Sequence, residues 1–180
     1  MNTHIHANTR TQQLLKVMLV LTWIAFIGLM IQPGALLVSY VVGCMYPEAI
    51  PKMYKGLDND TLRQFSFWHY SLFVFFRIAL SVMKALVLYL AIKAMSEVNL
   101  VSPFKLEMVR ILERISYVLL GTWIIATLHN IHAGWLLKRI GVAPDIWPPE
   151  AFIFMAGVVF IISQIFKRGV ELQSENDLTV

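Results

Sequence analysis

Four long apolar runs constrain this chain more than any other feature. They cover residues 14–31, 65–92, 115–137 and 147–166, and each is on the order of the ~20 residues that a helix needs to cross about 30 Å of hydrocarbon. The runs lack the alternating pattern of barrel strands, and lipid leaves helices as the other spanning structure. The sequence therefore predicts an all-α polytopic membrane protein, with residues 1–180 forming a single domain of four transmembrane helices packed as a four-helix bundle.

Composition supports the same class. Hydrophobic residues make up 58% of the chain and charged residues 14%, against about 25% charged in soluble domains. The single cysteine, Cys44, excludes a disulfide framework and a cysteine-based zinc site. The net charge of +4 is spread without a basic block, so no direct contact with nucleic acid is expected.

The segments between the runs predict where the chain leaves the membrane. Residues 45–64 form an outer loop, residues 96–110 an inner loop and residues 167–180 a cytosolic tail. In the inner loop, Ser102 and Pro103 suit the N-cap and first position of a helix that projects from the membrane. Pro33 and Gly34 interrupt the first run, so residues 35–44 are either a kinked continuation of that helix or an interfacial segment.

Lysine and arginine predict the orientation. Eight of them lie at the ends of the spans shared with the chain termini, and five lie at the opposite ends. The positive-inside rule then places the N- and C-termini in the cytosol. Three tryptophans at the opposite ends are expected to form an outer aromatic belt: Trp68, Trp135 and Trp147.

Two basic residues, Arg77 and Lys84, fall inside the second apolar run. They share a helical stripe with Tyr70 and Ser81, and no carboxylate lies deep in any span. Intramembrane charges are costly and often functional. One hypothesis is a ligand site formed by Arg77, Lys84, Tyr70 and Ser81, in which an anion, a lipid headgroup, water or carbonyl groups meet the arginine. The alternative is that Lys84 marks the inner interface and Arg77 only snorkels.

Three histidines near the outer ends of the helices are candidate metal ligands. His129 and His132 lie on one helical face, His69 is expected at a similar depth, and Asp145 follows in the next turn. Such a set suits zinc or copper, but no metal motif is present, and the alternative is interfacial histidines bonded to backbone or water. No cofactor is expected. The chain also lacks a nucleophile–base set and a phosphate-binding loop, so it is not expected to be an enzyme.

The C-terminal tail combines a charged helical stretch with the apolar ending Leu178-Thr179-Val180. This composition is typical of a segment that docks on the protein's own helices or on a partner. The residues expected to contribute to partner binding are Arg110, Arg114, Glu171, Glu175, Asn176, Asp177 and Leu178.

The tail also carries a resemblance. From Phe166 to Val180 the chain reads F-x-R-G-x-x-L-x-x-E-N-D-L-T-V, and Ser102-Pro103-Phe104 precede a charged helix. These features resemble an uncharacterised bacterial membrane family, domain-of-unknown-function family 2975. Genes of this family often neighbour a small helix-turn-helix regulator, so the resemblance implies a bacterial cytoplasmic (inner) membrane protein that holds a transcription factor.

Two functional hypotheses follow. The first is a membrane-anchored regulator or sensor that binds a cytosolic partner such as a small helix-turn-helix regulator. The second is a small-molecule or anion carrier that uses Arg77 and Lys84, and a chain of this size would need a homodimer for alternating access.

Overall fold

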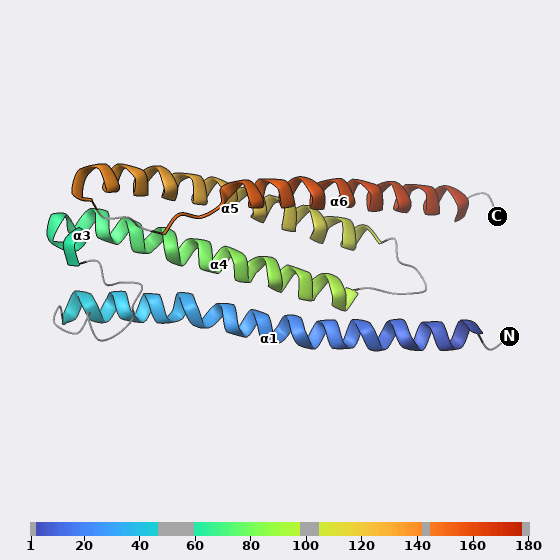
Figure 1. The fold of residues 1–180 in the computed structure, drawn as a ribbon. Coiled ribbons are helices and arrows are strands. Elements are labelled where there is room, and N and C mark those ends of the chain that lie inside the picture. Colours follow the sequence, from blue (N-terminus) through green and yellow to red (C-terminus); the bar gives the residue numbers. More distant parts are fainter. Residues whose placement is uncertain (1–2, 47–59, 98–104, 142–144, 178–180) are drawn as a thin grey trace.

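A computed structural model describes residues 3–46, 60–97, 105–141 and 145–177 (Figure 1). They form four long helices and one short one: α1 (Thr3–Met45), α3 (Asp60–Phe65), α4 (Phe67–Glu97), α5 (Leu106–Ile140) and α6 (Pro149–Asp177). All four long helices are long and apolar enough to cross a membrane. The predicted all-helical class is confirmed, as is the presence of four helices of the length and hydropathy that a membrane span requires. No strand occurs among the described residues.

The four long helices pack in chain order. α1 packs on α4, α4 on α5 and α5 on α6, and the backbones of the described parts of α1 and α6 do not approach each other. Figure 1 shows α1 and α6 at opposite edges of the molecule. The described helices therefore form an open row, in which each edge helix packs on one neighbour among the long helices. This arrangement differs from the expected four-helix bundle, in which every helix would have two neighbours.

Helix α1 shows whether Pro33 ends the first apolar helix. The helix runs without interruption through Pro33 for 43 residues, which at 1.5 Å per residue is about 65 Å. Residues 35–44 therefore continue the first helix. A proline removes one backbone donor and usually bends a helix rather than ending it when neighbouring elements hold both halves. Pro33 is buried, in line with such support.

Both chain termini lie at one end of the row (Figure 1), here called the terminal end. The other end, which includes α3 and the C-terminus of α5, is called the loop end. At the terminal end, α5 begins at Leu106 with Lys105 as its N-cap and no side-chain cap. The predicted cap residues Ser102 and Pro103 lie outside the described residues.

The buried side chains form two clusters. One lies towards the loop end and includes Tyr70 and Phe73 of α4 and Leu136 of α5. The other lies towards the terminal end and includes Leu90 of α4, Ile111 of α5 and Ala156 of α6. Ser81 and Ala85 of α4 are both buried, so the predicted polar stripe does face the protein interior.

The connection between α5 and α6 departs most from expectation. α5 ends at Gly141, which adopts a left-handed conformation with φ 69° that glycine takes without strain. Residues 145–148, here called the strap, are not helical. The strap contacts Asn130, ten residues before the end of α5, so it lies about 15 Å from the loop end of that helix. α6 consequently begins well short of the loop end of α5 (Figure 1), a depth that the gap between the third and fourth apolar runs does not indicate.

Gly121 allows close contact between α4 and α5, and this contact is testable. A Cβ atom at Gly121 would lie 2.9 Å from Cε of Met83, whereas nothing lies within 4 Å of the same atom at Gly134. Because Cε of Met83 is the tip of a flexible side chain that can move aside, leucine at position 121 should overpack the interface modestly and destabilise the protein by about 1 kcal/mol. We expect Gly121→Leu to melt at a lower temperature in detergent than the wild type, and Gly134→Leu to melt unchanged. Equal melting temperatures for the two variants would contradict this packing.

Candidate functional site

Asn130 fixes the strap to α5. Its amide nitrogen Nδ2 donates to the backbone carbonyl of Trp147 at 2.7 Å, and its oxygen Oδ1 accepts from the backbone N–H of Trp147 at 3.1 Å. One side chain thus satisfies both backbone groups of a non-helical residue. Unsatisfied backbone groups at membrane depth cost several kcal/mol each, so this pair of hydrogen bonds is what makes a strap at this depth tolerable.

Arg77 of α4 meets the strap at Asp145. Its Nη2 lies 3.5 Å from Oδ2 of Asp145, and the exposed fractions of the two side chains are 12% and 72%. The guanidinium also lies 5.8 Å from the ring centre of Phe73, within the range of a cation–π contact. The inference that no carboxylate is available at this depth is therefore wrong. The strap supplies this carboxylate, Asp145, from a segment between two apolar runs.

Lys84 meets the strap two residues further along. Its Nζ lies 3.6 Å from the ring centre of Trp147, a close cation–π contact. Lys84 follows Arg77 by seven residues, about 10 Å along α4, so the strap runs beside α4 from one cation to the other. Trp147 is consequently absent from the outer aromatic belt. Trp68 and Trp135 remain exposed near the loop end.

The other two residues of the predicted ligand site have different surroundings. Tyr70 is buried and its ring stacks on Tyr40 of α1, with ring centres 6.1 Å apart. The hydroxyl of Ser81 donates to the carbonyl of Arg77 in its own helix at 2.9 Å. The structure thus brings Arg77 and Lys84 together along the strap, with Tyr70 packed towards α1.

The histidines join α4 to α5. Nδ1 of His69 lies 3.1 Å from Nε2 of His132, and both rings lie against Trp135. His129 lies one turn away on α5, next to Phe73 and Phe76. Over the described ranges, no three His, Cys, Asp or Glu side chains are arranged to hold a metal ion. Two of the three predicted ligands therefore meet as a stacked, hydrogen-bonded pair, and Asp145 pairs with Arg77.

Three buried nitrogen atoms in this region have no hydrogen-bond partner among the described residues. They are Nε2 of His129, Nδ1 of His132 and Nε1 of Trp147. His129 is fully buried and is adjacent in sequence to Asn130, which holds the strap. Buried polar atoms in proteins nearly always have a partner, so this group of atoms indicates a polar site rather than a dry core.

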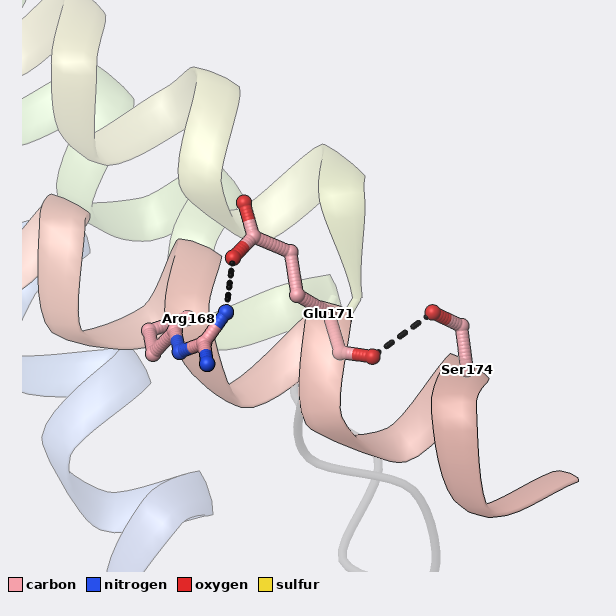
Figure 2. Close-up of polar contacts among 3 residues, drawn as sticks. All are labelled: Arg168, Glu171 and Ser174. Carbon is pink, nitrogen blue, oxygen red and sulfur yellow. Dashed lines mark hydrogen bonds and ion pairs between the residues drawn. The ribbon is translucent and has the colours of Figure 1, made fainter. Parts of the chain in front are cut away.

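The second candidate site is the C-terminal part of α6. Figure 2 shows Nη1 of Arg168 donating to Oε2 of Glu171 at 2.9 Å and the hydroxyl of Ser174 donating to the carbonyl of Glu171 at 2.7 Å. These contacts lie within α6, and all three residues are exposed. The segment is therefore a helix whose charged side chains face outwards.

The predicted partner-binding residues divide between α5 and α6. Arg110 and Arg114 are exposed near the start of α5, and Glu175 is exposed near the end of α6. Asn176 and Asp177 belong to α6, but their side chains lie outside the described residues, as does all of Leu178. Nε2 of Gln164 lies 3.5 Å from Oε1 of Glu113, and this contact connects α6 to α5 just before the exposed C-terminal part of α6 begins.

Sequence reasoning missed the roles of Asn130, Asp145 and Trp147. A weak signal was present, because Asn130 is an amide within an apolar run and Trp147 precedes two prolines, which disfavour a helix at that point. Neither signal gives the depth of the strap.

Comparison with known proteins identifies one family. The model of the family described as "Protein of unknown function (DUF2975)" matches residues 45–180, which include the strap, α4, α5 and α6. Neither the curated proteins nor the solved structures contain a match to this chain.

The unequal burial of Arg77 and Asp145 predicts unequal effects of mutation. Asp145→Asn leaves a buried cation without its carboxylate and should destabilise the protein by about 1–2 kcal/mol, whereas Arg77→Gln leaves an exposed carboxylate and should cost less. The double variant should be more stable than the sum of the single effects predicts, with a coupling of about 0.5–1 kcal/mol. Thermal unfolding of the four proteins in detergent measures these effects. Additive effects would show that the two side chains do not interact.

Proposed function

Since the chain belongs to the DUF2975 family, whose function is not established, we propose a function from the geometry: it is a multi-pass membrane protein that binds a cytosolic partner through the exposed end of α6. Residues 167–177, here called the α6 extension, are the partner-binding surface in this proposal. The protein would act as an anchor or regulator of that partner rather than as an enzyme.

The exposure of the α6 extension is the observation that supports this function. Among the described helices, α6 packs on α5 and on no other helix. Figure 1 shows that the C-terminal part of α6 projects past the ends of α4 and α5. The eleven residues 167–177 correspond to about 16 Å of helix. An isolated helix of this length is marginal in water, so a projecting charged helix is well suited to gain stability from a partner.

The chemistry of the extension favours a small folded protein as the partner. Arg168 and Glu171 place both signs of charge on the surface, and Leu172 adds an exposed apolar side chain. Mixed charge around an apolar residue is typical of a protein interface. Arg110 and Arg114 at the start of α5 add positive charge at the same end of the molecule.

The resemblance to the family suggests the kind of partner and the side of the membrane. A small helix-turn-helix regulator, held at the cytoplasmic membrane of a bacterium, would be removed from DNA while bound. The excess of basic residues at the terminal end supports a cytosolic location for the extension. A change in helix packing would then alter the affinity for the regulator and release it.

The alternative function, an anion carrier, has weaker support. The anion-carrier hypothesis depended on two intramembrane cations that lack a carboxylate partner. In the structure, Arg77 pairs with Asp145 and Lys84 lies over the ring of Trp147. An incoming anion would have to displace a carboxylate that belongs to the chain itself.

Co-expression with a small helix-turn-helix regulator of the kind encoded beside other members of the family tests the proposed function. The regulator should sediment with membranes that contain the intact protein. Exchanging the charges of the extension, Arg168→Glu with Glu171→Arg, keeps the ion pair and the helix but reverses the surface, and should weaken binding about tenfold, which is 1.4 kcal/mol. Lys138→Glu at the loop end is the matched control and should bind normally. A regulator that stays soluble beside the intact protein, or that sediments equally with the exchanged variant, would contradict the proposal.

A further inference from the structure

The strap lies inside the predicted apolar runs. Asn130, which holds it, is seven residues inside the loop-end boundary of the third run at residue 137, and Arg77, which pairs with it, is twelve residues inside the boundary of the second run at residue 65. These separations correspond to about 10 Å and about 18 Å along the helices. The strap therefore lies within the span of a hydrocarbon core of about 30 Å.

At this depth the strap is exposed. The side chain of Asp145 is 72% exposed and Ile146 is 76% exposed. Non-helical backbone at membrane depth is tolerated only where it is buried in protein or lines a water-filled space, and intramembrane carboxylates follow the same rule. Since the protein itself buries only part of Asp145, water is the environment that suits the exposed part of this carboxylate.

A second observation points to water independently. Nε2 of the fully buried His129 and Nε1 of Trp147 have no hydrogen-bond partner among the described residues. Both residues adjoin the contact between Asn130 and the strap. Buried waters typically form hydrogen bonds with such polar atoms. Water molecules at the strap would therefore supply the hydrogen-bond partners that these two nitrogen atoms lack among the described residues.

We propose that water from the loop end reaches the strap, so that the Arg77–Asp145 pair forms the floor of a hydrated site inside the membrane that admits small charged solutes. The opposite charges of the pair offer both a donor and an acceptor to such a solute. This inference concerns the loop end and the centre of the protein, and it is independent of partner binding at the α6 extension.

Cysteine accessibility tests the proposal, and the chain offers a matched pair of positions. Ile146 of the strap and Ile131 of α5 are 76% and 65% exposed, and they flank the hydrogen-bonded residues Trp147 and Asn130, so they lie at a similar depth. Each is changed to cysteine in a Cys44→Ser background and treated in membrane vesicles with a membrane-impermeant charged methanethiosulfonate. The thiolate is the reacting species and forms in water rather than in hydrocarbon.

We expect Ile146→Cys to react about tenfold faster or more than Ile131→Cys, because only the first thiolate contacts water. Lys138→Cys marks the loop end and Ser174→Cys the terminal end, and Ile146→Cys should react with reagent added on the side of Lys138→Cys. Equal rates at Ile146→Cys and Ile131→Cys would overturn the proposal. Reaction of Ile146→Cys only from the side of Ser174→Cys would also overturn it.

Discussion

The rest of this structure depends on how one non-helical residue satisfies its backbone at membrane depth. Asn130 supplies both a donor and an acceptor to Trp147, so the chain can leave helical geometry where hydrocarbon would otherwise forbid it. Because the strap is held there, α6 begins about 15 Å short of the end of α5. The 29 residues of α6 then extend past α4 and α5 at the terminal end (Figure 1), and the exposed extension is a consequence of the deep start.

The strap also gives partners to two cations that would otherwise be expensive inside a membrane. Arg77 pairs with Asp145, and Lys84 lies over the ring of Trp147. Both contacts come from residues that immediately precede α6, so α6 connects the polar centre of the protein at one end to the charged extension at the other. One continuous helix, α6, therefore joins the polar centre of the protein to the charged extension.

Much of the helical architecture could be predicted from the sequence, because the length of an apolar run reports directly on a spanning helix. The four spans and the inward-facing stripe with Ser81 and Ala85 follow from hydropathy and helical periodicity. The strap could not be predicted, because hydropathy assigns residues 138–147 to a turn and contains no information on how deep a turn lies. The roles of Asn130 and Asp145 depend on contacts between distant segments, and the expected belt position of Trp147 was wrong for the same reason.

Disulfide crosslinking measures the depth of the strap directly. In a Cys44→Ser background, Trp147→Cys is combined with Thr127→Cys or with Leu137→Cys, so that Asn130 keeps its two hydrogen bonds to the backbone of residue 147. Thr127 lies one turn of α5 before Asn130, and Leu137 lies two turns after it, closer to the loop end. A conventional turn at the membrane surface would place residue 147 near position 137, whereas the strap places it beside position 130, one turn from position 127. We predict rapid crosslinking of Thr127→Cys/Trp147→Cys and little of Leu137→Cys/Trp147→Cys. The reverse result would contradict the structure of the strap.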